Sequence, residues 1–168
     1  MAFSIGDKVV HRYHGPGRIA RLDQVETRSG PRDCYVVTMG HGLVVWVPID
    51  GSSEVSLRPP LSASTVARLA DILRGLPQPL HTASKERTEQ IRALMKDGSP
   101  EALCTLVRDL TAYGTRRVLN AGDAAALERA RSIVIAEWAL ATDSPDAAGE
   151  IDALLRESAR RNAEDPTR

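Results

Sequence analysis

The sequence predicts an α+β protein of two domains: a small β-barrel over residues 1–60, then an all-helical domain of about five helices over residues 61–168. Composition changes near residue 60, from rich in Val and Gly to rich in Ala, Leu, Arg and Glu. Before this point apolar residues come in short runs between turn residues, and after it they recur at helical spacing. The 168 residues suffice for one core of normal size or two small ones.

The first 60 residues contain four short runs typical of strands. These are Lys8 to Arg12, Arg18 to Thr27, Cys34 to Met39, and Leu43 to Val47. Breaks at Gly15-Pro16-Gly17, Ser29-Gly30-Pro31 and Gly40-His41-Gly42 separate them, and Pro48 ends the last run. Four or five strands in so short a segment favour a small barrel, because closing the sheet hides its edges.

Five amphipathic segments follow Pro59-Pro60, each bounded by a capping residue or a break. The first runs from Ser62 or Ser64 to Gly75, and the second from about Ser84 to Asp97-Gly98. The third begins at Ser99, with Pro100 in its first turn, and the fourth begins at Asn120 or Gly122. The fifth runs from roughly Pro145 to Arg161. A polar tail, Asn162 to Arg168, completes the domain. Trp138 lies among apolar residues of the fourth helix, which favours a place in the core.

The charge balance excludes a protein that coats nucleic acid by charge alone. The chain has 22 basic and 22 acidic side chains and a pI near 6.9. Residues 1–60 contain seven basic and six acidic side chains, and residues 61–168 contain fifteen basic and sixteen acidic ones. Neither part therefore has the excess of basic residues that binding to nucleic acid by counterion release requires. No apolar run approaches the roughly 20 residues of a membrane span, and the N-terminus is unlike a signal peptide, so we expect a cytoplasmic protein.

The sequence gives no support for catalysis, a metal site or a cofactor. No HExxH spacing, Walker loop or GxSxG turn occurs, and we treat His11, His14 and His41 as ordinary polar residues near turns. Cys34 and Cys104 lack a neighbouring Cys at metal or redox spacing, which predicts two buried thiols. We therefore expect a protein that is not an enzyme.

Trp46 is the strongest candidate for a binding residue in the first domain. Alternation along Leu43 to Val47 places Val45 and Val47 on one face and Trp46 on the other. If the two valines fill the barrel, Trp46 points outward and could anchor a partner. The alternative, equally compatible with the sequence, is that Trp46 covers the barrel mouth or packs on the first helix.

A modest surplus of two positive charges lies in the second and third helices and the turn after them. The basic residues are Lys85, Arg87, Arg92, Lys96, Arg108, Arg116 and Arg117, and the acidic ones are Glu86, Glu89, Asp97, Glu101 and Asp109. Such a mixture is typical of a solvated helix face. The surplus could position a phosphate backbone but would not hold it tightly.

The order of these features resembles the CarD/CdnL family of bacterial RNA polymerase-binding transcription regulators. The N-terminal segments that carry the resemblance are Phe3-Ser4-Ile5-Gly6-Asp7-Lys8-Val9-Val10-His11, His14-Gly15-Pro16-Gly17, Tyr35-Val36-Val37, Val45-Trp46-Val47-Pro48 and Leu57-Arg58. The C-terminal segments are Leu106-Val107-Arg108-Asp109-Leu110, Leu119-Asn120-Ala121-Gly122-Asp123, Ala130-Arg131 and Glu137-Trp138-Ala139-Leu140-Ala141. The resemblance implies a Tudor-like (SH3-like) barrel that docks on the polymerase β subunit, and a helical domain that meets promoter DNA.

The chain departs from the family at the positions that the resemblance associates with binding. The wedge Trp of the family falls at Ala83, while Lys85 and Arg87 keep basic groups that could touch phosphate. Two positions at the polymerase contact, often Arg in the family, fall at Val25 and Trp46, which implies a more apolar docking surface. The resemblance therefore implies a divergent member that binds the β subunit through Val25 and Trp46, with a weaker contact to promoter DNA that depends on polymerase.

Two other functions stay open on the sequence. The chain could be a protein-interaction adaptor that has lost promoter DNA and uses its helical domain on another protein. It could also recognise a methylated side chain, which would need an aromatic cage built from Phe3, Tyr13, Tyr35 and Trp46.

Overall fold

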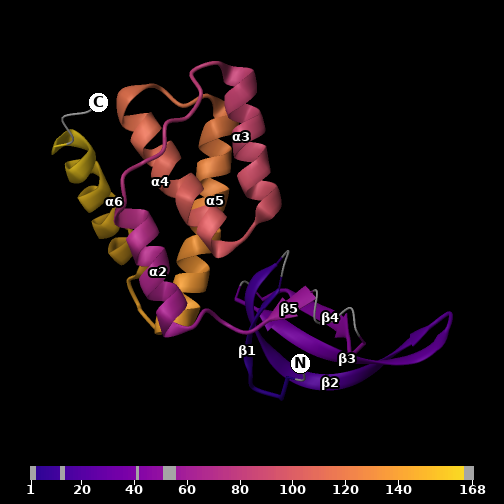
Figure 1. The fold of residues 1–168 in the computed structure, drawn as a ribbon. Coiled ribbons are helices and arrows are strands. Elements are labelled where there is room, and N and C mark those ends of the chain that lie inside the picture. The colour runs from indigo at the N-terminus through magenta and orange to yellow at the C-terminus, as the bar shows by residue number, and fades with distance from the viewer. Residues whose placement is uncertain (1–2, 12–13, 41, 51–55, 165–168) are drawn as a thin grey trace. The chain divides into compact units, whose positions relative to one another are not determined.

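The structure is a computed structural model that describes residues 3–11, 14–40, 42–50 and 56–164. The chain forms two compact units, Met1–Leu61 and Ser62–Arg168. The first contains a β-sheet and the second contains helices (Figure 1), as the composition change near residue 60 predicts. Each unit is described by itself.

The first unit is a five-stranded antiparallel sheet in the order β4-β3-β2-β1-β5. Its strands are β1 (Lys8–His11), β2 (Gly15–Thr27), β3 (Gly30–Met39), β4 (Val44–Pro48) and β5 (Leu57–Arg58). The expected strands are all present, and β2 and β3 are longer than expected because they pair up to a tight turn at residues 28–29. Arg12, the expected end of the first strand, lies outside the described residues. The β2–β3 hairpin extends past the rest of the sheet (Figure 1).

The expected break at Gly15-Pro16-Gly17 is wrong, because these three residues begin β2 and pair with β1. Gly17 faces the neighbouring strand so closely that an added Cβ would lie 2.9 Å from the Thr38 carbonyl oxygen. Gly15 has a φ of +75°, a conformation that glycine adopts without steric cost. Gly15 therefore allows the backbone conformation at the start of β2, and Gly17 allows β2 to approach β3 closely.

One face of the sheet forms the core of this unit. Its buried members are Val9, Ile19, Tyr35, Val37, Met39, Val47 and Leu57. Phe3 and Val45 pack against them, and the rings of Phe3 and Tyr35 meet edge to face with centroids 5.9 Å apart. The opposite face also holds buried side chains, those of Val10, Cys34 and Val36.

The second unit contains five helices, as the periodicity predicts. They are α2 (Ala63–Arg74), α3 (Ser84–Asp97), α4 (Pro100–Arg116), α5 (Ala121–Thr142) and α6 (Ala147–Glu164). Side-chain oxygens of Ser62, Ser99 and Asn120 accept backbone N–H groups at the starts of α2, α4 and α5, which decides between the alternative caps. Helix α6 starts and ends later than expected and includes Asn162, while residues 165–168 of the expected tail lie outside the described residues.

Helix α4 lies against each of the other four helices and supplies the centre of the second core. Leu106, Val107 and Leu110 are fully buried on it. Trp138 on α5 is buried, as expected, and its indole N–H donates to Glu150 on α6 at 2.7 Å. Among the described helices, none combines the length and the apolar character needed to cross a membrane.

Candidate functional site

The outer face of the sheet carries Trp46. Val47 lies in the core and Val45 packs against it, so alternation turns Trp46 to the other side, where 47% of its surface is exposed. Trp46 lies opposite Val36 on β3, and Val36 lies opposite Arg21 on β2. Val36 is fully buried on this outer face. The structure therefore shows that Trp46 points away from the core of its own unit.

Two charged residues of β2 adjoin Trp46. Arg21 donates to Asp23 at 3.0 Å. This hydrogen bond, that from the Gln24 backbone and a further one from the Trp46 side chain hold the pKa of Asp23 below its ordinary value. The Arg21–Asp23 pair is exposed and adds little stability. We call Arg21, Asp23, Val44 and Trp46 the Trp46 face, a partly apolar patch with a fixed carboxylate beside the indole.

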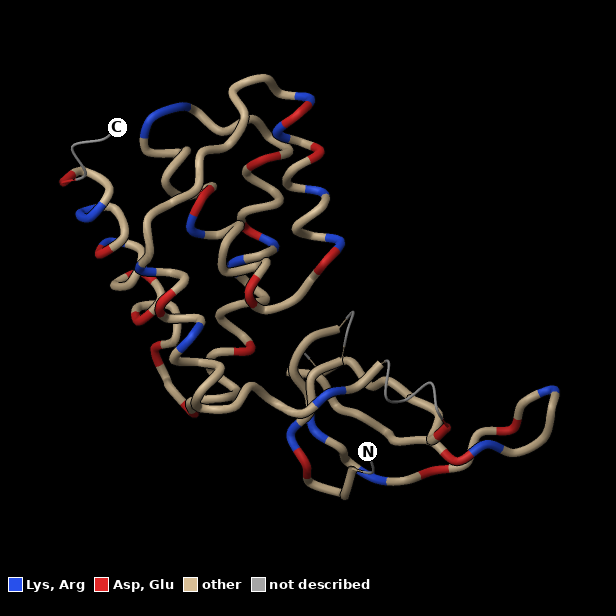
Figure 2. Tube along the Cα trace, viewed as in Figure 1, with Lys and Arg blue, Asp and Glu red and all other residues tan. Residues whose placement is uncertain are grey.

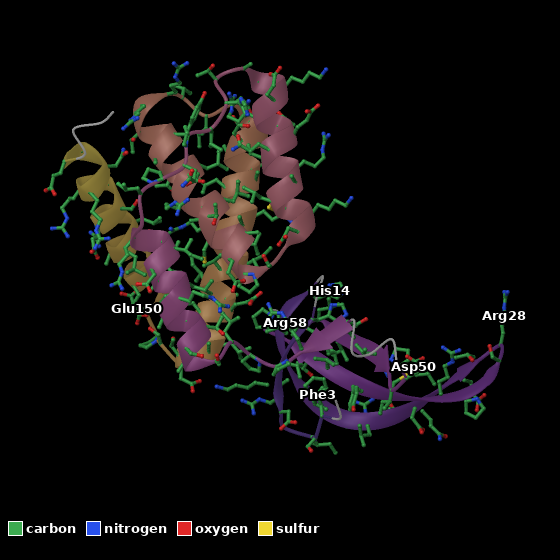
Figure 3. The ribbon with its side chains drawn as sticks, viewed as in Figure 1. Phe3, His14, Arg28, Asp50, Arg58 and Glu150 are labelled. Atoms are coloured by element: carbon green, nitrogen blue, oxygen red, sulfur yellow. The ribbon has the colours of Figure 1, made fainter. Side chains whose placement is uncertain are left out.

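Val25 lies on the same side of the sheet, further out along the hairpin. Beyond a register shift between Ile19 and Arg21, the residues Arg21, Asp23 and Val25 alternate onto the outer face. Val25 pairs with Arg32 and is half-buried. It lies about 13 Å from Arg21 at the usual rise per strand residue. Arg28 marks the tip of this hairpin (Figure 3). The structure thus places Val25 and Trp46 on one face without clustering them.

Arg87 does not lie where a phosphate contact needs it. Its side chain is 7% exposed, and Nε donates to Asp123 Oδ2 at 2.8 Å. The same guanidinium donates to the carbonyl oxygens of His81 and Thr82 and lies over the Tyr113 ring, 4.9 Å from its centroid. Arg87 is therefore a buried residue that stabilises the helical unit, and its expected solvated position is wrong.

Lys85 and Ala83 are both exposed at the start of α3. Ala83 is the N-cap residue and makes no side-chain capping hydrogen bond. Lys85 is the basic residue of the expected pair that faces solvent. Figure 2 shows Lys and Arg interspersed with Asp and Glu along α3, in line with a mixed helix face.

Arg108 and Asp109 form a second buried pair, so their expected place on a solvated helix face is also wrong. Arg108 Nε donates to Asp109 Oδ1 at 2.7 Å, and Arg108 Nη1 donates to the Ile72 carbonyl oxygen. Asp109 also accepts the backbone N–H of Gln78 at 2.9 Å. The position of these charges inside the apolar run Leu106 to Leu110 is the sequence signal that could have predicted their burial. No comparable signal marks Arg87, because its carboxylate partner is 36 positions away.

The remaining candidates are the histidines, the cysteines and the aromatic residues of the sheet unit. Among the described residues no group of three or more His, Cys, Asp or Glu could hold a metal ion. Tyr35 is buried on the face opposite Trp46, which argues against an aromatic cage, and Tyr13 lies outside the described residues, as does His41. Both cysteines are buried thiols, as expected, and burial raises the pKa of Cys104 to about 12.

His11 and His14 lie together near the start of the sheet. Their ring centroids are 4.7 Å apart, and His11 Nδ1 accepts the backbone N–H of His14. Burial, and then the charge of His14, lowers the pKa of His11 from its ordinary value of 6.5. The interaction stabilises a neutral His11 and gives the unit a pH-dependent contact.

Comparisons with known proteins place both units in one family. Residues 3–59 match the family described as CarD-like/TRCF RID domain, and residues 68–155 match the family described as CarD, C-terminal domain. The first is an RNA polymerase-interacting domain family with a Tudor-like fold. A relative from Bacillus subtilis (strain 168), described as "Putative transcription factor YdeB", is 24% identical over 136 residues, covering 80% of this chain and 89% of the relative. With both domains matched in order, the chain belongs to the CarD-like family of transcription factors.

Proposed function

We propose that the chain binds the β subunit of bacterial RNA polymerase through the Trp46 face, with Val25 as a second contact, and modulates promoter initiation. The exposed indole of Trp46 supports this proposal most directly. A large aromatic side chain presented on a rigid sheet is the kind of residue that dominates the energetics of protein interfaces. Val44 beside it is also exposed, so docking would bury a small apolar patch.

The Arg21–Asp23 pair would affect the specificity and the association rate of this contact. The Asp23 carboxylate is held by Arg21 and by the Gln24 backbone, so it keeps a fixed charge next to the indole. A fixed charge at the rim of an interface contributes mostly to specificity and association rate. The partner surface would therefore combine an apolar pocket for Trp46 with polar groups facing β2.

We propose a weak DNA contact for the helical unit that depends on polymerase. Ala83 replaces a wedge side chain, and Lys85 is exposed two residues later. Arg87 is not part of this proposal, because it is buried against Asp123. Holding a weak DNA contact on the polymerase raises its effective concentration, so low intrinsic affinity suffices. Binding to polymerase would place the chain in the cytoplasm, at the nucleoid.

A pull-down of the full chain with a fragment of the β-subunit lobe tests the proposed function. Retention of the wild-type chain, with loss on Trp46→Ala, supports it. Failure of the wild type to bind contradicts it.

A second function is an adaptor that binds polymerase and another protein but no DNA. The small side chain of Ala83 and the internal role of Arg87 favour this alternative. The salt dependence of complex formation, measured with and without promoter DNA, separates the two functions. Only phosphate contacts make the dependence steeper when DNA is present.

A further inference from the structure

The turn between α4 and α5 presents two cations and an apolar side chain to solvent. Arg116 ends α4, Arg117 is its C-cap residue, and both are exposed. Val118 follows and is 96% exposed. Within the part of the chain that the structure describes, neither guanidinium has an ion-pair or hydrogen-bond partner. We call these three residues the RRV turn.

The RRV turn lies at the same end of the helical unit as the start of α3. A cleft of about 270 Å³ is lined by Thr82, just before α3, and by Tyr113, Arg116 and Arg117. Arg87 fixes this arrangement, since it binds the Thr82 carbonyl oxygen and Asp123 at the start of α5 while lying over Tyr113. Figure 2 shows the basic α4–α5 turn at the end of the unit where α3 begins.

Two buried carboxylates in this region, Asp109 and Asp123, are paired inside the helical unit. Asp109 lines the cleft but accepts from Arg108 and from the Gln78 backbone. Asp123 accepts from Arg87. Glu86, by contrast, is exposed beside Lys85 and offsets its charge. Asp109, the acidic residue in the cleft lining, is thus already paired and does not neutralise Arg116 and Arg117.

We propose that the RRV turn is the principal DNA-contacting element of the helical unit, with Arg116 and Arg117 on backbone phosphates and Val118 against the sugars of the minor groove. This inference rests on the proposed function and names the residues that carry its DNA contact. Arginines bind phosphate oxygens with two parallel donors, and apolar side chains are used by other proteins in the minor groove. In this proposal the buried Arg87 positions the RRV turn, and the RRV turn makes the DNA contact in place of Arg87.

The test measures binding of fork-junction promoter DNA to a complex of polymerase with the full chain, over a range of salt concentrations. In Arg116→Ala/Arg117→Ala the slope of log K against log salt should fall by about 2, one unit for each lost phosphate contact. The matched control is Arg156→Ala/Arg160→Ala, which removes two exposed charges from α6 and should leave the slope unchanged. Val118→Asp should weaken DNA binding without changing the melting temperature, because Val118 packs on nothing.

Binding to polymerase without DNA is measured for every variant, so that the two proposals fail differently. If the wild type does not bind polymerase, the proposed function is wrong and this inference falls with it. If all variants bind polymerase and the RRV double variant keeps the wild-type slope, only the inference is overturned. An equal loss of slope in the α6 control would also overturn it, because the effect would then be one of net charge.

Discussion

Arg87 Nε donates to Asp123 Oδ2 at 2.8 Å, and both side chains are almost completely buried. The pair joins the first turn of α3 to the first turn of α5. Asp123 is itself positioned by Asn120, which caps α5 by accepting the Asp123 backbone N–H. A residue that the family resemblance suggested for DNA thus holds three segments of the helical unit together.

Arg87→Met should destabilise the helical unit by about 3 kcal/mol, because it leaves the Asp123 carboxylate buried without its cation. Urea unfolding followed by Trp138 fluorescence in a Trp46→Phe background measures this. The double variant Arg87→Met/Asp123→Leu should recover most of the loss. Lys85→Ala, on the exposed side of the same turn, is the control and should change stability by less than about 0.5 kcal/mol. An effect of Lys85→Ala as large as that of Arg87→Met would contradict this account.

Ala83→Ser should stabilise the helical unit by about 1 kcal/mol, because α3 lacks a side-chain cap and serine supplies one. The urea midpoint reports the change. Ala63→Ser provides the control, since Ala63 opens a helix that Ser62 already caps. Equal gains in the two variants would show that capping is not the cause.

Ala83→Trp should lengthen the lifetime of the open promoter complex. Ala83 is exposed at the N-cap of α3, so an aromatic ring there can project into solvent without displacing the core. A ring inserted at a base step stabilises unstacked DNA. The lifetime is measured as the decay of open complexes after addition of a competitor, with Ala83→Ser as a control for the cap. An unchanged lifetime in Ala83→Trp would argue against this placement of the wedge position.

Lowering the pH should destabilise the sheet unit. The folded-state pKa of His11 is below 6.5, so the unfolded chain binds more protons in the interval between the two values. Stability is therefore full above pH 6.5 and falls as the pH drops below it. Denaturant midpoints at pH 7.5 and 5.5, read from Trp46 fluorescence in a Trp138→Phe background, measure the effect. His11→Asn keeps an acceptor for the His14 N–H but cannot titrate, and should reduce the difference; an equal difference in this variant would assign the effect to other groups.

Local chemistry in the sequence is enough to predict the elements and most of their ends. Ser62, Ser99 and Asn120 are capping residues by type. Alternation puts Trp46 on the face opposite Val45 and Val47, whereas the sequence leaves open whether Trp46 is exposed there. The entry into β2 could not be predicted from Gly15-Pro16-Gly17, because the need for glycine at Gly17 arises from a neighbour on β3. The role of Gly17 therefore becomes clear only once the pairing register of β2 and β3 is known.

The sequence predicts the candidate site less completely than the fold, for a related reason. Burial of Arg87 depends on Asp123 and Tyr113, which come from two other helices. Charge counting treats Arg87 and Arg116 alike, whereas packing buries the first and exposes the second. Only the tertiary structure separates structural arginines from those free to bind a partner.

The dissociation constant of the full chain for a β-subunit lobe fragment, measured by calorimetry, tests the central claim most directly. We expect measurable binding by the wild type and at least a tenfold loss in Trp46→Ala, since truncating a buried interface tryptophan costs about 2 kcal/mol or more. Ile5→Ala removes another exposed apolar side chain of the same unit and should bind like the wild type. Equal affinities for the wild type and Trp46→Ala would contradict the claim that the Trp46 face docks on polymerase.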